Sequence, residues 1–208
     1  MQSARTLRRA RTDTWKPLRA PDAPMRRSTA AVQAAILVYD LRASGVVRNA
    51  LRIAAAAAAS GLAAELWVVR RTGAFAGDTG GVPVRVIAEG VSRLSRVADS
   101  ALTLPALAAA IRRVRPAVLL SSGNHMHAFA CAAHRLSGVS GTRLVGRASN
   151  ALAAATPPKR AGLAAGLIRW SAMALERAQF GMMDGVIAVS RELADDLNRR
   201  AGVSGARP

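Results

Sequence analysis

The sequence predicts an α/β fold in which helices flank a Rossmann-like parallel sheet. Short apolar runs alternate with longer helical segments from Ala34 onward. Each run is apolar throughout rather than at every second residue, which is typical of strands buried on both faces of a sheet. Small polar residues follow four of these runs, at the edge where parallel sheets place their binding loops. These three observations favour one layered domain of alternating strands and helices.

The first half of the chain divides into elements at its glycines and prolines. The predicted order is strand 34–39, helix 46–60, strand 63–69, glycine-rich loop 70–81 and strand 82–88. Gly61 is expected to cap the first helix, because glycine accepts the left-handed conformation that ends many helices. Pro83 lacks a backbone N–H, so its strand is expected to begin there or to lie at an edge of the sheet.

The second half continues the same alternation. The predicted order is helix 102–115, strand 117–122, helix 125–136, strand 143–147, loop 149–162, helix 163–182, strand 185–190 and helix 191–202. Pro105 is placed near the first turn of its helix, where a missing N–H is acceptable, and Pro116 ends that helix. Gly202 is expected to end the last helix.

Length and charge divide the 208 residues into a basic tail, 1–30, and one domain, 31–208. The formal net charge is +18, and the tail holds eight basic side chains against Asp13 and Asp22. The tail is predicted to be disordered, or to be an over-extended start with Met25 as the initiator. The charge favours an anionic partner, either lipid, phosphate or nucleic acid. Nucleic acid is disfavoured because the basic residues of the domain are not interleaved with aromatic ones.

Cysteine usage and hydropathy restrict the compartment. The single cysteine, Cys131, excludes an internal disulfide and lies in an apolar helical segment, so a buried thiol is expected rather than a nucleophile. No run of about 18 apolar residues predicts a membrane span, and no apolar segment directly follows the basic N-terminus as in a secretory signal. We therefore expect a cytoplasmic protein.

The turn Ser44-Gly45 follows the first strand and begins the first helix. Backbone N–H groups at a helix N-terminus bind anions, and Arg48 in the first turn reaches the same place. Taken alone, the turn is better explained by Gly45 making a tight connection and Ser44 capping the helix. A phosphate site therefore needs the support of the other loops.

Three further loops place polar side chains at strand ends. Asn124 and His125 follow one strand and are suited to hydrogen-bond a hydroxylated substrate. Arg147 and Asn150 end the next strand, where arginine binds phosphate or carboxylate well, although an arginine on a solvated loop is the commoner case. Ser190 is predicted to be the N-cap of the last helix.

Several other chemistries find no support in the sequence. His125, His127 and His134 do not predict a metal site, because positions two apart point to different sides of a helix and no carboxylate or cysteine has ligand spacing. The sequence holds no G-x-S-x-G elbow and no Cys-His pair at motif spacing, and Asp195 and Asp196 are predicted to be solvated helix surface. Hydrolases are therefore disfavoured, and no metal is expected.

Taken in order, these segments resemble the family-4-like glycosyltransferases of GT-B fold. DLRASGVVRNALRIAAAAAASGLAAELWVV is similar to the family's opening strand, its Gly-Gly-x-Glu-Arg-type turn, helix and second strand. RRVRPAVLLSSGNHMHAFACAAHRLSG is similar to the family's Arg-Pro-Asp-Val strand, the Asn/His loop and the following helix. RLVGRASN and ALERAQFGMMDGVIAVSRELADDL resemble the next two segments. The resemblance covers residues 34–203.

Three positions depart from the family's pattern. Ser44 stands in place of the first glycine of the turn and Val47 in place of its glutamate, while the second glycine and the arginine are present. Ser149 stands where many members carry a histidine of the catalytic site, and Asn150 matches the family. These departures leave the catalytic residues unassigned.

The resemblance implies the acceptor-side, N-terminal half of a retaining glycosyltransferase that transfers a hexosyl group from a nucleotide-sugar to a glycan or lipid-linked acceptor. It places Ser44, Gly45 and Arg48 toward the donor phosphates and Asn124, His125, Arg147, Ser149 and Asn150 on the acceptor side. In the family a second domain carries the donor site and a Glu-x7-Glu pair. We expect this chain to lack it, to be inactive without that domain or a partner subunit, and to use the nucleotide-sugar as substrate with no cofactor.

Two further hypotheses stay open. A non-catalytic α/β module that binds a phosphorylated ligand would use the same turn. The segment LIRWSAMALERAQF and the basic surface also predict peripheral contact with an anionic membrane, although core packing explains the apolar positions of that segment equally well.

Overall fold

The computed structural model describes residues 31–87, 96–149 and 163–201. The predicted tail 1–30, nearly all of the predicted loop 149–162, and Gly202 lie outside these ranges. Within them, every helix falls short of the length or the hydropathy that a membrane span requires.

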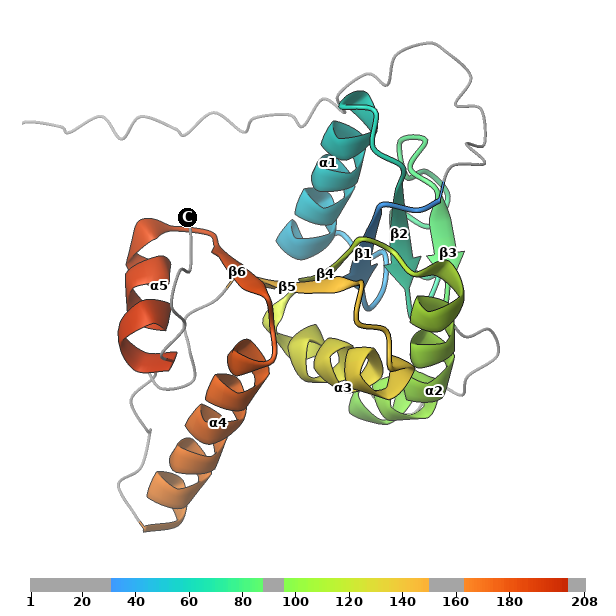
Figure 1. The fold of residues 1–208 in the computed structure, drawn as a ribbon. Coiled ribbons are helices and arrows are strands. Elements are labelled where there is room, and N and C mark those ends of the chain that lie inside the picture. The colour runs from blue at the N-terminus through green and yellow to red at the C-terminus, as the bar shows by residue number, and fades with distance from the viewer. Residues whose placement is uncertain (1–30, 88–95, 150–162, 202–208) are drawn as a thin grey trace, which may run out of the picture.

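Six parallel strands form one twisted sheet in the order β3-β2-β1-β4-β5-β6 (Figure 1). The strands are β1 (Ala34–Val38), β2 (Ala64–Val68), β3 (Val84–Val86), β4 (Val118–Ser122), β5 (Arg143–Ala148) and β6 (Gly185–Ala188). The chain winds outward from β1 to β3 and then returns to the other side of β1. The predicted α/β class with a Rossmann-like parallel sheet is confirmed.

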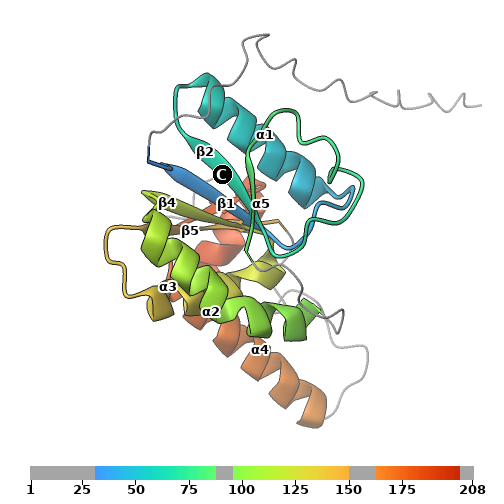
Figure 2. The same ribbon diagram turned by 90° about the vertical axis from the view of Figure 1, so that its right-hand side faces the viewer.

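Helices cover both faces of this sheet, with α1 on one face and α2, α3 and α4 on the other (Figures 1 and 2). The helical elements are α1 (Gly45–Ala59), α2 (Arg96–Val114), η1 (Asn124–Met126), α3 (His127–Ser137), α4 (Leu163–Gly181), α5 (Arg191–Asp196) and η3 (Leu197–Ala201). Gly61 has φ +81° directly after the first helix, as its predicted capping role requires.

The two faces of the sheet explain the unbroken apolar strands. Ile36 belongs to a buried cluster that includes Leu51 of α1. The next residue, Leu37, points to the opposite face and belongs to a cluster with Ile111 of α2 and Phe129 of α3. Because successive side chains of a strand alternate between the faces, a strand covered on both sides needs apolar residues at every position.

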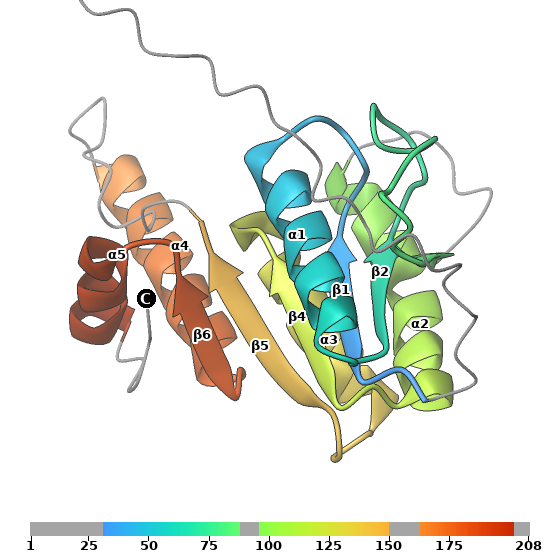
Figure 3. The same cartoon turned by 90° about the horizontal axis from the view of Figure 1, so that it is seen from above.

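A third, smaller cluster lies at the β6 edge, where α4 and α5 approach this strand (Figure 3). It contains Phe180 of α4, Val186 and Ala188 of β6, and Leu193 of α5. This cluster completes the fold at the end of the described chain.

The prediction for the second helix was wrong at its start. α2 begins at Arg96 rather than at residue 102, so Pro105 lies inside the helix and not in its first turn. A proline inside a helix removes one backbone hydrogen bond and costs about 3 kcal/mol. Two features of the preceding turn offset this cost: Asp99 is tied to other elements by its buried side chain, and Thr103 Oγ1 donates to the Asp99 carbonyl at 2.8 Å.

The remaining differences concern element ends. β3 and β6 are shorter than predicted, and β3 begins directly after Pro83 at the edge of the sheet, as expected for a strand limited by proline. The helix after β4 opens with the 3-10 turn η1 before α3. The last helix changes to π geometry at Leu197, where the sequence predicts one continuous helix.

Candidate functional site

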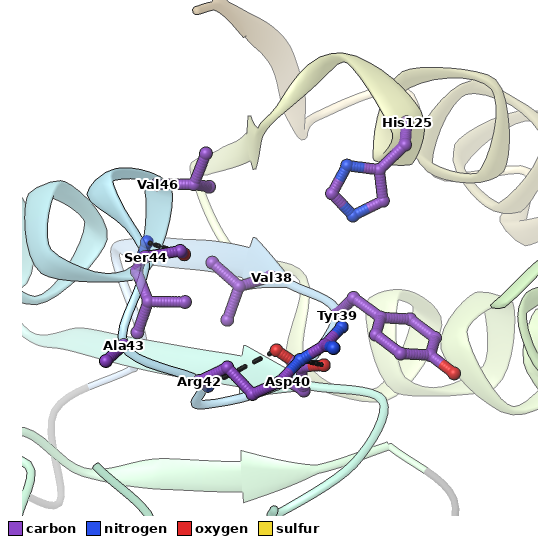
Figure 4. Close-up of a pocket in the computed structure, with 9 residues that line it drawn as sticks. Val38, Tyr39, Asp40, Arg42, Ala43, Ser44, Val46 and His125 are labelled. Carbon is purple, nitrogen blue, oxygen red and sulfur yellow. Dashed lines mark hydrogen bonds and ion pairs between the residues drawn. The ribbon is translucent and has the colours of Figure 1, made fainter. Parts of the chain in front are cut away.

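A pocket lies where the strand order reverses, at the carboxyl ends of β1 and β4 (Figure 4). It is lined by Val38, Tyr39, Asp40, Arg42, Ala43, Ser44, Val46, Val47 and His125. The loops that leave β1 and β4 run to opposite faces of the sheet, and this divergence opens a crevice. Open parallel sheets bind their ligands at such points.

The turn before α1 forms one side of the pocket. Ser44 is the N-cap of α1, and its Oγ accepts a hydrogen bond from the Val47 N–H at 3.3 Å. Gly45 is the first residue of the helix, and a Cβ built there would have no atom within 4 Å. Arg48 is exposed on the first turn, outside the pocket lining. The helix N-terminus is therefore open to a ligand, with its positive dipole end at the pocket.

Asp40 and Arg42 form the charged side of the pocket. The Arg42 Nε donates to Asp40 Oδ2 at 2.6 Å, and Asp40 is 9% exposed. His125 reaches in from the opposite side of the pocket (Figure 4). Burial lowers the pKa of His125, while the nearby Asp40 acts in the other direction. The imidazole is therefore neutral near pH 7, with one nitrogen to donate and one to accept.

A buried polar cluster supports this wall of the pocket from behind. The Tyr39 hydroxyl donates to Asp99 Oδ2 at 2.5 Å, and Arg70 Nη2 forms an ion pair with the same oxygen at 2.6 Å. Burial and the hydrogen bond to Asp99 raise the pKa of Tyr39 to about 12. The rings of Tyr39 and His125 meet edge to face, with centroids 6.5 Å apart. The cluster thus fixes the ring against which His125 rests.

The loop after β2 holds the loop after β1 in place. The Leu41 N–H donates to the Thr72 carbonyl at 2.9 Å, and the Phe75 N–H donates to the Leu41 carbonyl at 3.0 Å. Gly73 has φ +123°, and a Cβ there would lie 2.4 Å from the backbone nitrogen of Arg42. Only glycine allows this approach, so the pocket wall depends on a second loop that does not line it.

A second group of polar residues lies one strand further along the sheet. Asn124 Oδ1 accepts a hydrogen bond from the Ser149 N–H at 3.0 Å, which joins the loops after β4 and β5. Arg147 is the second-last residue of β5 and is half-buried, and burial lowers the pKa of its guanidinium. The structure therefore brings Asn124, Arg147 and Ser149 together, beside the pocket rather than in its lining.

The other predicted residues are placed as follows. Ser44 and His125 face the same pocket, whereas Asn150 lies outside the described residues. Ser190 is the N-cap of α5, where its Oγ accepts from the Leu193 N–H at 3.2 Å, after the far edge strand β6. Ser190 thus has a capping role, as predicted, and no place in the pocket.

Three polar residues of the pocket lining were missed by sequence reasoning: Tyr39, Asp40 and Arg42. The predicted strand included Tyr39, which made this side chain look like core. Asp40 follows the apolar run directly, and a carboxylate at the carboxyl end of a parallel strand was the signal that would have found it.

The three histidines do not converge. His127 Nδ1 lies 2.9 Å from Ser121 Oγ in the core, and His134 Nε2 lies 2.9 Å from the Thr142 carbonyl, while His125 faces the pocket. Among the described residues, no three histidine, cysteine, aspartate or glutamate side chains are arranged to hold a metal ion. Cys131 is 1% exposed and burial raises its pKa to about 11, so its thiol belongs to the core as predicted.

The pocket can bind a ligand that carries both hydroxyl groups and negative charge. The Asp40 carboxylate accepts from hydroxyl groups, and the neutral His125 ring either donates or accepts. The N-terminus of α1 attracts an anion.

The solved structures that share this fold include two GT-B glycosyltransferases. The apo form of the lipopolysaccharide outer core galactosyltransferase WaaB superposes with a TM-score of 0.55 and 11% identity, over 80% of this chain and 42% of that chain. MurG of Acinetobacter baumannii superposes with a TM-score of 0.50 and 13% identity, over 77% of this chain and 42% of that chain. The chain thus spans less than half of either protein and resembles their N-terminal domain.

No curated protein matches the sequence. The family model described as Glycosyltransferase Family 4 matches residues 43–208. This match begins in the loop between β1 and α1, runs through the Asn124–Ser149 connection and includes β6, so it covers most of the fold and one side of the pocket. The chain belongs to Glycosyltransferase Family 4.

Proposed function

We propose that this protein is the acceptor-side, N-terminal half of a glycosyltransferase that moves a hexosyl group from a nucleotide-sugar to a glycan or lipid-linked acceptor. The observation that carries the proposal is the pocket at the reversal point between β1 and β4, in a chain of this family. That pocket combines an open helix N-terminus with a carboxylate and a neutral histidine.

In this proposal Ser44, Gly45 and Arg48 face the donor phosphates. The amides at the start of α1 and the helix dipole favour negative charge, and Arg48 adds a full positive charge on the same turn. Ser44 and Val47 replace two residues of the family's turn, but the cap that Ser44 makes keeps the helix N-terminus in place.

The acceptor side consists of His125 with its neighbours. His125 and Asp40 lie across the pocket from each other and hydrogen-bond a hydroxyl of the acceptor. Asn124 orders the loop after β5 through Ser149, and Arg147 extends the same surface. The family resemblance also assigns Asn150, which lies outside the described residues, to the acceptor side. Catalytic roles are not assigned to these residues.

Transfer requires a second, donor-binding domain, in the same polypeptide or in a partner, because the pocket here supplies only one wall of a two-domain cleft. The protein is cytoplasmic in this proposal and contacts an anionic membrane peripherally. The support for that contact is α4, whose Trp170 and Leu175 are 68% and 56% exposed. Exposed tryptophan and leucine near arginines favour a lipid interface.

Amide NMR on the isotope-labelled 208-residue protein tests the donor side. UDP-glucose, UDP-galactose and UDP are the probes, and we expect shifts of the backbone amides of residues 44–48. Arg48→Gln should weaken UDP-sugar binding by about tenfold, because a charged hydrogen bond to phosphate is lost. Arg52→Gln is the matched control, since Arg52 lies one turn further along α1 and is also exposed.

Two outcomes would contradict the proposal. One is an absence of shifts at residues 44–48 at millimolar UDP-sugar, and the other is an equal effect of both arginine variants. The requirement for a second domain is tested separately with radiolabelled UDP-hexose: transfer to any acceptor by these 208 residues alone refutes it.

A further inference from the structure

Two adjacent strands end in polar side chains that lie side by side on one face of the sheet. Ser122 of β4 pairs in register with Arg147 of β5. Leu120 and Val145, two residues earlier on the same strands, pack in the cluster beneath α1. Because side chains alternate along a strand, Ser122 and Arg147 project from that same face, at its carboxyl edge.

Three polar atoms at this place are enclosed and have no hydrogen-bond partner among the described residues: Ser122 Oγ, Arg147 Nη1 and Ser149 Oγ. Ser122 is fully buried, and the other two residues are half-buried. A buried polar atom without a partner is unfavourable, and native structures keep few of them. Three such atoms on neighbouring strand ends point to a partner that the described part of the chain does not supply.

The charge of this group is also uncompensated. Arg42, Arg70 and Arg85 each have a carboxylate oxygen within 2.8 Å. Among the residues that the structure describes, no carboxylate pairs with Arg147. An arginine stays charged at physiological pH, so its partly buried guanidinium lacks a counter-ion. The missing partner is therefore an anion.

The backbone around the group is already ordered. The hydrogen bond from the Ser149 N–H to Asn124 fixes the loop after β5 against the turn after β4. That turn contains Gly123 at φ +100°, where a Cβ would lie 3.3 Å from Val46 Cγ1 and 3.4 Å from His125 Cε1. The turn therefore packs between the start of α1 and His125, and it connects the group to the pocket.

We propose that Arg147, Ser122 and Ser149 form an anion subsite that binds a phosphoryl group of the substrate beside the pocket. The guanidinium presents paired N–H donors to two phosphate oxygens, and the serine hydroxyls donate to the remaining ones. The inference rests on the proposed function, whose reaction offers two sources of this chemistry. They are the diphosphate of the nucleotide-sugar and the phosphate of a lipid-linked acceptor.

Titration of the full 208-residue protein with inorganic phosphate, followed by amide NMR, tests the subsite. Arg147→Gln should weaken phosphate binding by about tenfold or more, as expected when a charged hydrogen bond is lost. Arg143→Gln is the matched control, because Arg143 lies on the same strand and face but at the opposite, exposed end. Equal affinity of Arg147→Gln and the unchanged protein, or an equal loss in Arg143→Gln, overturns the subsite.

Thermal unfolding distinguishes a loss of phosphate binding in Arg147→Gln from a loss of folding. Arg147 makes no ion pair with any described residue, so without phosphate Arg147→Gln should unfold at the same temperature as the unchanged protein or at a higher one. Phosphate should then raise the unfolding temperature of the unchanged protein but not of the variant. If Arg147→Gln fails to fold, Ser149→Ala replaces it. Undiminished phosphate affinity in Ser149→Ala then overturns the subsite.

Competition identifies the source of the phosphoryl group. If UDP displaces inorganic phosphate, the subsite binds the diphosphate of the donor. If dodecyl phosphate displaces inorganic phosphate while UDP stays bound to the protein, the subsite binds the phosphate of the acceptor. If neither compound displaces phosphate, the assignment to a substrate is wrong. The two proposals can be refuted separately. If UDP-sugars shift the amides of residues 44–48 and phosphate binding does not depend on Arg147, only the subsite is refuted. If phosphate binding depends on Arg147 but UDP-sugars do not shift the amides of residues 44–48, only the proposed donor-binding face is refuted.

Discussion

Protonation of His127 should make the fold sensitive to acid. The His127 side chain is buried in the core, with its Nδ1 2.9 Å from Ser121 Oγ and its ring edge to face with Phe180. Burial lowers the pKa of His127 from 6.5 to about 4. The unfolded chain therefore binds a proton near pH 6.5 that the folded protein accepts only near pH 4. Stability that is fully present above pH 6.5 is lost as the pH falls toward 4.

The expected loss follows from the two pKa values. Their difference, at about 1.4 kcal/mol for each pH unit, corresponds to roughly 3 kcal/mol of unfolding free energy. Urea unfolding followed by circular dichroism at pH 7 and pH 4 measures it. We expect His127→Gln to be less stable than the unchanged protein at pH 7, because ring packing is lost, but to lose about 3 kcal/mol less between the two pH values.

The matched control is His134→Gln, at the other end of α3, where the ring contacts the Thr142 carbonyl. That variant should keep the acid sensitivity of the unchanged protein. His125 has a lowered pKa as well, so some acid sensitivity should remain in His127→Gln. The reasoning is refuted if His127→Gln and the unchanged protein lose the same free energy between pH 7 and pH 4.

Two further changes test the supports of the pocket. Asp99→Ala removes the carboxylate that faces Arg70, whose side chain is only 19% exposed. This change should lower the unfolding free energy by about 3 kcal/mol, measured by urea titration. A loss below about 1 kcal/mol would mean that the ion pair contributes little to stability. Gly73→Ala places a Cβ 2.4 Å from the Arg42 backbone at φ +123°. The control is Gly61→Ala, where φ is +81° but the space around the Cβ is open, and this variant should lose about 1 kcal/mol of stability. Thermal unfolding should show a much larger loss of stability for Gly73→Ala. Equal losses in these two glycine variants would argue against close packing of the two loops.

The fold was largely predictable because its signals are local. Buried parallel strands are mostly apolar on both faces, so β1 stands out in the sequence as AAILV, and β2 and β4 stand out as apolar runs interrupted by Glu65 and ended by Ser121 and Ser122. The start of α2 was not predictable in this way. It depends on Asp99, which pairs with Arg70 from another element, and this long-range pair outweighs the helix-breaking tendency of Pro105.

The pocket was predictable only in part, for a related reason. Ser44 and His125 follow predicted strands, and the topology of a parallel sheet brings strand ends together. The neighbours that tune and hold them, such as Tyr39 and Gly73, act through tertiary contacts that no local pattern encodes. The group around Arg147 shows the same limit, since only the tertiary structure reveals that no carboxylate among the described residues pairs with this arginine.

The strand order also has a consequence for folding of the protein during its synthesis on the ribosome. β1 pairs with β2 on one side and β4 on the other, but Val118 of β4 follows Val38 of β1 by 80 residues. At synthesis rates of 5–20 residues per second, β4 is made roughly 4 to 16 s after β1. Throughout that interval one edge of an apolar central strand has no partner. Sites for chaperone contact in the nascent chain should therefore concentrate on residues 34–38 and end once residues 118–122 have emerged.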